Sequence, residues 1–381
     1  MRAEPVDGAD PRAVLRGLRG AVLGAGPAIA LGGGVPAGEV PSGTAVIVTT
    51  SGSTGHPKSV VLSRSALTSS ALATADRIGS GAWLLALPAG YIAGVQVLVR
   101  ALVAGREPAI LAGSFSTQAF AAAAGAMASS DGGVAVPMYT SLVPAQLQTL
   151  LDAEETGIRT GLQRFEAVLV GGQALAAPLA DRARAAGVRV VRTYGSSETS
   201  GGCVYDGVPL GGVDVRIEDD EVQVAGPVLA EGYLGEPERT AAAFVRDAAG
   251  RRWYRTGDLG TFDGVLRVTG RRDNVIVSGG VNVSLDRVER VVRSLPGLHD
   301  AVVVSVADPR WGEASVVAVP AADLAGADVA AVLRETRAAV GAALGAPARP
   351  RGILPVDRIP LLPSGKPDRG TLRAAAARAA V

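Results

Sequence analysis

The stretch TAVIVTTSGSTGHPKSVVLSRSALTSSALATADR, residues 44–77, decides the fold of this chain. Its apolar, β-branched start predicts a buried strand over residues 44–49. A loop of small residues follows, and a helical pattern runs from about residue 64 to residue 77. A strand that leads through a glycine-rich loop toward a helix is typical of proteins in which helices cover a largely parallel sheet.

The same alternation continues as far as residue 192. Strands are expected near residues 83–87, 109–111, 133–136, 167–170 and 188–192. Helices are expected to end near residue 103 and to span residues 117–128, 140–152 and 175–186. Strands and helices in regular alternation predict an α/β fold with mixed, largely parallel sheets.

The pattern changes after about residue 205. VDVRIEDDEVQVAG, residues 213–226, and GVLRVTGRRDNVIVSG, residues 264–279, indicate short strands joined by Asp and Gly turns. These segments predict an antiparallel β subdomain. Beyond them, a small α+β unit is expected, with helices over residues 284–295 and 327–343 and strands over residues 301–307 and 314–320.

Composition excludes several classes of function. The 381 residues are 48% hydrophobic, which is enough for a large core, and 37 basic against 36 acidic side chains leave a net charge of +1. Such a balance gives no electrostatic reason to expect nucleic acid or an acidic membrane surface as a partner. The longest apolar stretch near the start, residues 21–38, is broken by Gly and Pro, so stable membrane insertion is not expected.

The scarce cysteine, histidine and lysine residues carry further information. The single cysteine, Cys203, suits a reducing compartment, and the two histidines lie too far apart in sequence to suggest a structural metal site. Only two of the 37 basic residues are lysines, Lys58 and Lys366. In a chain that otherwise uses arginine, these two positions are candidates for sites that need a compact ammonium group.

The loop of residues 49–59 is a candidate phosphate site. Backbone N–H groups of a Gly-rich loop at a strand end can point at phosphate oxygens, and the Ser and Thr hydroxyls add donors. Lys58 can offset polyphosphate charge. The Walker pattern G-x-x-x-x-G-K-[ST] is absent here.

With this loop and several later motifs, the chain resembles the adenylate-forming superfamily, which includes acyl-CoA synthetases, luciferases and peptide-synthetase adenylation domains. Tyr194-Gly195-Ser196-Ser197-Glu198-Thr199 resembles its aromatic-Gly-x-x-Glu-Thr motif, and Gly171-Gly172-Gln173 resembles a turn beside the adenine. A Tyr face can stack on adenine and a Glu carboxylate can hold Mg²⁺. The resemblance implies the following nucleotide-binding residues: Thr50, Ser51, Gly52, Ser53, Thr54, Gly55, Gly172, Gln173, Tyr194, Gly195, Ser196, Asp258 and Arg271.

The later motifs imply two domains that move. Tyr254-Arg255-Thr256-Gly257-Asp258 resembles the ribose-binding motif, and Gly270-Arg271-Arg272-Asp273 resembles a hinge with Asp273 as the pivot. The resemblance therefore implies a large ATP- and acyl-binding domain over residues 1–270 and a small mobile lid domain over residues 274–381. Within the lid, Ser278-Gly279-Gly280 resembles the loop that lines the coenzyme A tunnel, and Pro363-Ser364-Gly365-Lys366 the loop of the catalytic lysine.

What the resemblance implies is an AMP-forming acid–thiol ligase. ATP would convert a carboxylate to an acyl-adenylate with release of pyrophosphate, and coenzyme A would then displace AMP. The implied catalytic residues are Lys366, Glu198, Thr199 and Lys58, with Glu198 as the ligand of Mg²⁺. Rotation of the small domain would withdraw Lys366 between the two steps.

The identity of the acid is indicated by residues 87–102, LPAGYIAGVQVLVRAL. This segment resembles the acyl-pocket motif, with Tyr91 where many relatives have His. Arg100 either ends an apolar helix face in solvent or faces the pocket, where it would suit an acid with a second carboxylate. Within the superfamily, the chain most resembles the short actinobacterial ligases that join o-succinylbenzoate to coenzyme A in menaquinone biosynthesis. Only 48 residues precede the phosphate loop, which agrees with such a short form. Tyr91, Gln96, Arg100 and Thr140 are the substrate candidates.

Two other functions fit the same motifs. One is an adenylation enzyme that loads another aryl or acyl acid onto coenzyme A or a carrier protein, and the other is a nucleotide-binding relative without catalysis. Val281 departs from the Glu that relatives often carry in a Gly-Gly-Glu-Asn run. A cytoplasmic location is expected, and a homodimer is compatible with the sequence.

Overall fold

The computed structural model describes residues 2–24, 26–32, 39–50, 57–127, 130–153, 161–362 and 365–379. These residues divide into two units. The large unit comprises Met1–Glu218, Gln223–Thr256 and Phe262–Leu266, and the small unit comprises Asp219–Val222, Gly257–Thr261 and Arg267–Val381. The sequence-based domain limits and the hinge at Asp273 stay predictions.

The deciding stretch forms part of a five-stranded sheet. Its strands in spatial order are β1 (Ala3–Val6), β2 (Ala28–Leu31), β3 (Thr44–Thr50), β4 (Lys58–Ser63) and β16 (Gly232–Tyr233). β1, β2 and β3 run parallel, whereas β4 is antiparallel to β3 and to β16. β4 was not identified from the sequence. The phosphate loop therefore leads into a strand before the helix begins.

A seven-stranded sheet carries most of the large unit. Its strands in spatial order are β13 (Val208–Pro209), β12 (Gly201–Tyr205), β11 (Val190–Ser196), β10 (Ala167–Val170), β9 (Met138–Leu142), β5 (Ala82–Leu85) and β6 (Ala109–Ile110). The strands from β11 to β6 are parallel, and β12 and β13 add an antiparallel edge. This mixed sheet confirms the predicted α/β class.

One stretch of the sequence-based assignment was wrong. Residues 140–152 were expected as one helix, but Met138–Leu142 forms a central strand and the helix starts only at Pro144. Pro at the first helical position favours that start, and the MYTSL run before it is fully buried in the sheet. The strand expected at residues 133–136 instead belongs to a separate hairpin of β7 (Ser130–Asp131) and β8 (Val134–Ala135).

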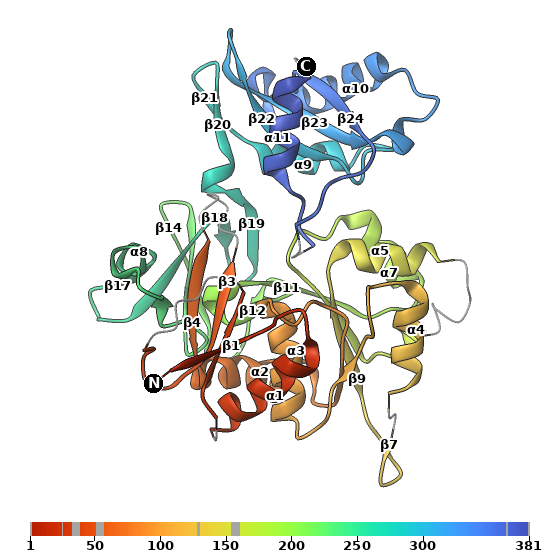
Figure 1. Ribbon diagram of the computed structural model, residues 1–381. Helices are drawn as coiled ribbons and strands as arrows, with labels where there is room; N and C mark the ends of the chain where they lie inside the picture. Colours follow the sequence, from red (N-terminus) through yellow and green to blue (C-terminus); the bar gives the residue numbers. More distant parts are fainter. Residues whose placement is uncertain are drawn as a thin grey trace. The chain divides into compact units, whose positions relative to one another are not determined.

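Helices fill both sides of the seven-stranded sheet (Figure 1). α1 (Pro11–Leu23), α2 (Arg64–Ile78) and α3 (Ile92–Val103) pack between the two sheets, since α1 and α2 contact β3 while α3 contacts β5, β9 and β12. The helices on the opposite face are α4 (Thr117–Gly125), α5 (Pro144–Asp152) and α7 (Ala177–Ala185). The result is a layered α/β unit.

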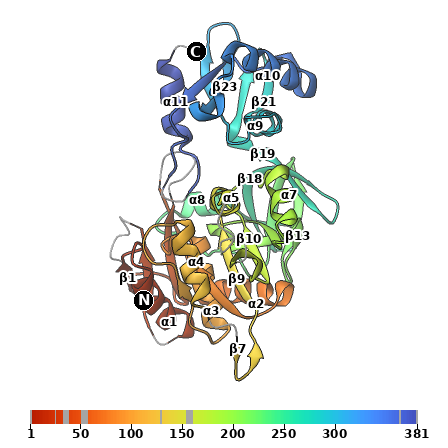
Figure 2. The same cartoon turned by 90° about the vertical axis from the view of Figure 1, so that its right-hand side faces the viewer.

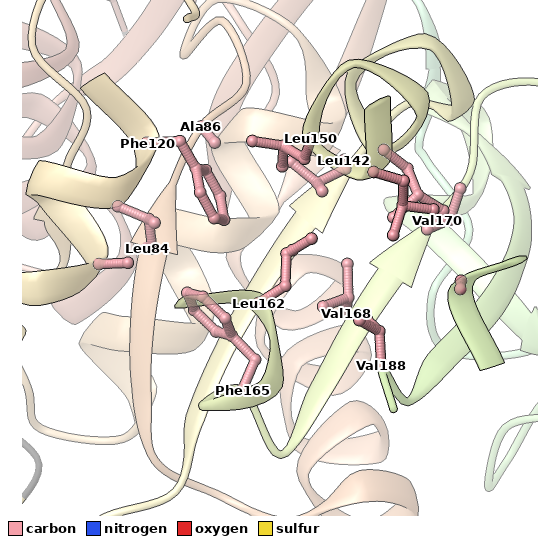
Figure 3. Packing of buried hydrophobic residues seen from close by; sticks show 14 of the residues in the cluster. Leu84, Ala86, Phe120, Leu142, Leu150, Leu162, Phe165, Val168, Val170 and Val188 are labelled. Carbon is pink, nitrogen blue, oxygen red and sulfur yellow. The ribbon is translucent and has the colours of Figure 1, made fainter. Parts of the chain in front are cut away.

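The core beneath α4, α5 and α7 is almost entirely apolar. Figure 3 shows Phe120 and Phe165 turned toward each other beside Leu84 of β5, and their ring centroids are 5.8 Å apart. Val168 and Val170 of β10 point into the same cluster. Burial of such side chains stabilises each by about 1.5–3 kcal/mol relative to exposure. This core holds the carboxyl ends of the parallel strands in place, where the candidate site lies.

The remaining strands of this region form a third sheet. Its strand order is β14 (Asp214–Glu218), β15 (Glu221–Ala225), β18 (Arg252–Phe262) and β17 (Phe244–Arg246), with β19 (Leu266–Arg271) paired to β18. α8 (Pro237–Ala243) precedes β17. Asp219 and Asp220 form the turn between β14 and β15 with positive φ values of 50° and 63°, which Asp tolerates better than most residues.

The small unit is a sheet between two helical layers. Its strands are β20 (Val275–Ser278), β21 (Val281–Ser284), β22 (Val302–Asp308), β23 (Gly312–Pro320) and β24 (Gly352–Val356), and β22 ends the strand order. Alternate residues of β22 face opposite sides: Val303 packs under α9 (Leu285–Arg293) and α10 (Val329–Leu344), and Val302 packs under α11 (Arg369–Arg378). Figure 2 shows α11 on one side of the sheet and the other two helices on the opposite side.

None of the helices in the described part of the chain combines the length and the apolar character needed to cross a bilayer.

Candidate active site

Lys58 begins β4, where it pairs in register with Thr50 at the end of β3. The Thr50 hydroxyl is buried and has no hydrogen-bond partner in the described part of the chain. Ser51, Gly52, Ser53, Thr54 and Gly55, which the sequence assigned to the phosphate site, lie outside the described residues. Thr50 and Lys58 mark the two ends of that loop.

Glu198 is the centre of a buried charged cluster. It lies in a short 3-10 turn, Ser197–Thr199, between β11 and β12, and only 2% of it is exposed. Its Oε1 forms an ion pair with Lys58 Nζ and accepts a hydrogen bond of 2.9 Å from the Tyr233 hydroxyl. The structure thus joins two residues predicted to act together, although they are far apart in sequence.

The electrostatics of the cluster keep Glu198 ionised. Burial alone would raise the pKa of its carboxyl, but the charge of Lys58 and the hydrogen bonds from Lys58 and Tyr233 lower the pKa below its ordinary value. Burial and the neighbouring Glu198 raise the pKa of Tyr233. The tyrosine therefore stays protonated and donates, and the carboxylate stays an acceptor, across the ordinary pH range.

Tyr233 is a site residue that the sequence reasoning missed. It lies in the two-residue strand β16, which pairs with β4, and the Lys58 ammonium lies 5.2 Å from its ring centroid. A single Tyr within AEGYLGEPERT, residues 230–240, has no spacing signal. The pairing of β16 with β4, together with a bond of 2.8 Å from the Ala230 N–H to the Glu198 carbonyl, brings it to Glu198.

Thr199 and Gly195 shape the turn that carries Glu198. Thr199 Oγ1 accepts a bond of 2.8 Å from the backbone N–H of Ser196 and donates one of 2.8 Å to the carbonyl of Gly201. A Cβ on Gly195 would lie 2.0 Å from that same carbonyl oxygen, so the close approach of β11 and β12 requires glycine there. The predicted contact of Thr199 with a phosphate stays a prediction.

The predicted adenine residues lie at the carboxyl ends of two neighbouring strands of the seven-stranded sheet. Gly172 and Gln173 follow the end of β10, and Tyr194 lies near the end of β11, which is parallel to β10. The carboxyl ends of parallel strands are where such sheets bind ligands. Gly172 has a φ of +80°, which favours glycine at this turn.

The acyl candidates occupy α3 and β9. Tyr91 is the N-cap residue of α3, and Gln96 and Arg100 follow on one face, four residues apart, with exposed fractions of 1% and 6%. Thr140 is fully buried in β9 and its hydroxyl donates to the carbonyl of Leu84 at 3.0 Å. The structure therefore brings Gln96 and Arg100 together and engages the Thr140 hydroxyl with backbone.

Arg100 is a buried cation without a recorded carboxylate partner in the described part of the chain. Its Nη2 donates to the Tyr205 hydroxyl at 3.1 Å, and its guanidinium lies 5.0 Å from the Trp83 ring centroid. Its Nε is buried and has no hydrogen-bond partner among the described residues. The alternative in which Arg100 ends its helix in solvent is therefore wrong. The Oε1 of Gln96, one helical turn away from Arg100, is also buried and has no hydrogen-bond partner among the described residues.

In the small unit, the predicted ribose and hinge residues form one network. Arg271 Nη1 donates to Asp258 at 3.0 Å and its Nε donates to Asp273 at 2.8 Å. Asp286, at the start of α9, accepts from the Arg271 backbone N–H and from the Asn274 side chain, each at 2.7 Å. Asp286 is a contact that the sequence reasoning did not identify.

The predicted coenzyme A loop is the tight turn between β20 and β21. Gly279 and Gly280 have φ values of +57° and +79°, and the Gly279 N–H donates to the carbonyl of Trp311 at 2.8 Å. A Cβ on Gly279 would lie 2.5 Å from the Trp311 ring. Glycine is therefore required at position 279 by close contact as well as by backbone conformation. Ser278 is buried at the end of β20.

Lys366 lies in the segment between β24 and α11, and its side chain is exposed. Its carbonyl accepts a bond of 2.8 Å from the Leu362 N–H, and Leu361 bridges Pro367. Pro363 and Ser364 of the predicted motif lie outside the described residues. Backbone contacts between residues 361–362 and 366–367 thus hold the described segment that carries the lysine.

Comparison with protein families accounts for most of the chain. The family described as AMP-binding enzyme matches residues 18–234, more than half of the sequence. The AMP-binding enzyme C-terminal domain matches residues 287–366.

Individual relatives match over most of their own length. A probable 2-succinylbenzoate–CoA ligase of Mycobacterium tuberculosis is 39% identical over 345 residues, which cover 88% of this chain and 85% of that protein. The amide bond synthetase McbA of Marinactinospora thermotolerans has a TM-score of 0.73 at 29% identity, covering 92% of this chain and 75% of McbA. The o-succinylbenzoate CoA synthetase of Bacillus subtilis, solved with the acyl-adenylate OSB-AMP, has a TM-score of 0.68 at 27% identity, covering 87% and 69%.

Proposed function

The chain belongs to the family of AMP-binding enzymes, and on that premise we propose that it is an AMP-forming ligase that joins 2-succinylbenzoate to coenzyme A. The observation that carries the choice of acid is the 39% identity, over nearly the whole of both chains, to a probable 2-succinylbenzoate–CoA ligase. The buried charged cluster of Glu198, Lys58 and Tyr233 supports the choice of chemistry.

The reaction has two steps. In the first, a carboxylate oxygen of the acid attacks the α-phosphorus of ATP, the bond to pyrophosphate breaks, and an acyl-adenylate forms. In the second, the sulfur of coenzyme A attacks the acyl carbon and AMP leaves. Negative charge grows at the phosphate during the first step, so fixed cations and donors accelerate it. Lys58 and Lys366 are the only lysines available for that role.

A Mg²⁺ ion fits the donors of this site. Glu198 offers a carboxylate that stays ionised, and the described residues contain no group of three or more His, Cys, Asp or Glu side chains that could form an all-protein cage. Mg²⁺ is commonly held by one or two carboxylates together with substrate phosphates, which matches a single glutamate. When bound, it would neutralise phosphate charge. Lys58 and Tyr233 hold the carboxylate in place.

The small unit is proposed to supply the remaining groups in turn. Lys366 would serve the first step, and Ser278, Gly279 and Gly280 would line the path of coenzyme A in the second. Asp258 would bind the ribose hydroxyls, because a carboxylate accepts from both. The ion pairs of Arg271 with Asp258 and Asp273 support one functional unit of ribose site and hinge.

Arg100 is the proposed recognition group for the second carboxylate of 2-succinylbenzoate. An unpaired buried cation is costly, and an anionic ligand that approaches it regains part of that cost. Tyr205 holds one guanidinium nitrogen, and the Nε has no protein acceptor among the described residues. A site with this charge favours a dianionic acid over a neutral aromatic acid of the same shape. Gln96 and Tyr91 would complete the pocket.

Arg100→Met is expected to raise KM for 2-succinylbenzoate by about 10- to 100-fold, the equivalent of one charge-assisted hydrogen bond. Methionine keeps an apolar stem beside Trp83 and removes the charge. KM for 4-oxo-4-phenylbutanoate, which lacks the ring carboxylate, should change little. Steady-state kinetics with both acids test this, with Arg106→Ala as the control, because Arg106 is a half-buried cation beyond the same helix that pairs with Asp131. Equal changes for both acids would remove Arg100 from the site.

The function itself is tested by AMP formation with ATP, Mg²⁺ and coenzyme A. Turnover with 2-succinylbenzoate, and not with benzoate, a medium-chain fatty acid or no acid, is the expected result. Turnover with a different acid would keep the chemistry and overturn the proposed substrate. Pyrophosphate release without thioester formation would favour the alternative in which a carrier protein accepts the acyl group. No pyrophosphate release with any acid would favour the alternative of a nucleotide-binding relative without catalysis.

Two further properties are proposed with the function. A cytoplasmic location follows from the need for ATP and coenzyme A, and fractionation of cells would test it. A homodimer stays a prediction that sedimentation analysis would decide.

A further inference from the structure

We propose that Arg369 and Glu289 form an anchor that positions Lys366 for adenylation, an inference that rests on the proposed function. Arg369 is the first residue of α11 and follows Lys366 by three positions. Glu289 lies on α9, on the other side of the sheet of the small unit. Neither residue belongs to the motifs that suggested the chemistry.

Backbone hydrogen bonds join the two limbs of the loop that carries Lys366. The Leu362 N–H donates to the Lys366 carbonyl at 2.8 Å, and the Asp368 N–H donates to the Pro360 carbonyl at 2.8 Å. These bonds join the described residues on either side of the loop, 360–362 and 365–368, into one local element. They do not set the direction in which that element points from the unit, because both ends of each bond belong to the loop.

The base of the loop is held on two sides. Ile359 on the incoming limb packs against the apolar cluster under α11, a contact without directional preference. On the outgoing limb, the Arg369 guanidinium donates to the Val303 carbonyl at 2.6 Å and pairs with Glu289 Oε2 at 2.8 Å. A planar guanidinium bound to two acceptors has a defined orientation, which an apolar contact alone does not provide.

Glu289 is built to receive this arginine. It is only 8% exposed, and its Oε2 also accepts a bond of 2.9 Å from the N–H of Val303. The Glu289 carboxylate therefore binds the N–H of Val303 and the Arg369 guanidinium binds its carbonyl. Val303 lies on β22, the edge strand of this sheet. Arg293 binds the other oxygen, Oε1, at 3.1 Å. The network fixes the start of α11, and with it the loop, to α9 and β22.

Precise placement matters more for Lys366 than for an ordinary surface residue. A misplacement of about 1 Å at a reacting group can lower a rate by roughly 10²-fold. Loops hold catalytic groups less precisely than helices or strands do, so a loop lysine needs support from a rigid element. Arg369 and Glu289 are positioning residues in this sense, since they act through Lys366.

The test compares the two half-reactions in Arg369→Ala and Arg369→Lys. For Arg369→Ala, we expect the rate of pyrophosphate release to fall by at least about 10-fold with little change in KM for ATP. Thioester formation from supplied acyl-adenylate should stay within about twofold of the wild type, because Lys366 has no role in that step. Arg369→Lys keeps a cation beside Glu289 but loses the planar guanidinium. Its rate of pyrophosphate release should therefore lie between those of the wild type and Arg369→Ala.

Arg293→Ala is the matched control. Arg293 pairs with the same carboxylate and donates from its Nε to a backbone carbonyl, that of Ala301 at 2.7 Å, but it lies on α9 and not beside the loop. It should destabilise the unit without slowing adenylation. Equal effects of Arg293→Ala and Arg369→Ala, or equal loss of both half-reactions in Arg369→Ala, would overturn the proposal and leave the network a structural one.

Hydrogen exchange gives a readout that does not depend on activity. The amides of Leu361, Leu362, Gly365, Lys366 and Asp368 should exchange faster in Arg369→Lys than in the wild type, and at an unchanged rate in Arg293→Ala. Unchanged exchange in Arg369→Lys would overturn the anchor. If the wild type forms no acyl-adenylate from 2-succinylbenzoate, the proposed function fails, and the exchange measurement still decides whether Arg369 holds the loop.

Discussion

Lys366→Ala is expected to lose acyl-adenylate formation almost completely and to keep thioester formation. Removal of one preorganised cation from the transition state for attack on the α-phosphorus should lower the rate of pyrophosphate release by about 10²- to 10³-fold. The second step breaks the bond to AMP with the lysine withdrawn, so it should proceed near the wild-type rate. This contrast is the largest effect that any single substitution in the small unit should produce.

The measurement separates the steps. Pyrophosphate release from ATP and 2-succinylbenzoate reports the first step, and thioester formation from synthetic 2-succinylbenzoyl-AMP and coenzyme A reports the second. Arg373→Ala, which removes an exposed cation on the same helix α11, is the control and should leave both rates unchanged. Loss of both steps in equal measure would contradict a mechanism in which the two units alternate.

Glu198→Gln should have the second-largest effect, with adenylation lowered by about 10²-fold or more. The substitution removes the carboxylate proposed to hold Mg²⁺ and the charge that pairs with Lys58. It keeps the size of the side chain and an oxygen that can accept from Tyr233. Pyrophosphate release over a range of Mg²⁺ concentrations measures the loss. Glu231→Gln, an exposed glutamate next to β16, is the control, and an adenylation rate equal to that of wild type in Glu198→Gln would contradict the assignment.

The same variant has a pH signature. The pKa of Glu198 in the folded chain lies below its ordinary value of 4.5, so the ionised carboxylate stabilises the fold above that value. This contribution is lost as the pH falls through the lower folded-state pKa. The difference in the free energy of unfolding between wild type and Glu198→Gln should therefore shrink as the pH falls below 4.5. Denaturant unfolding across the acid range would measure it.

Much of the architecture was available from the sequence. The helix over residues 64–77 and the strand over residues 167–170 were predicted within a residue or so, because their apolar patterns extend over long or fully buried segments. The strands and helix within residues 133–152 were not predicted correctly. There, MYTSL is short and mixed in polarity, and it becomes a strand because β5 and β10 pair with it on either side.

The residues of the candidate site also fall into two groups, those that the sequence motifs indicated and those that only the structure showed. Motif spacing indicated Lys58, Glu198 and Lys366 and the chemistry that they would share. It gave no sign of Tyr233, Asp286 or the pair of Arg369 and Glu289, each of which lies in a segment without a motif. Arg100 was left between solvent and pocket, and burial among α3, Trp83 and Tyr205 decided that it is not a surface residue.

The sequence by itself determined the fold class, the family and the identity of the charged groups, because apolar periodicity and fixed motif spacing are local properties of the chain. Only the tertiary structure decided which of those groups meet. Glu198 Oε1 receives Lys58 from β4 and Tyr233 from β16, two strands that pair with each other, while Glu198 itself lies in the turn after β11 of the other sheet. Such contacts depend on sheet register and on burial, which convert residues distant in sequence into neighbours in a water-poor site. There the charge of each changes the protonation and the orientation of the others.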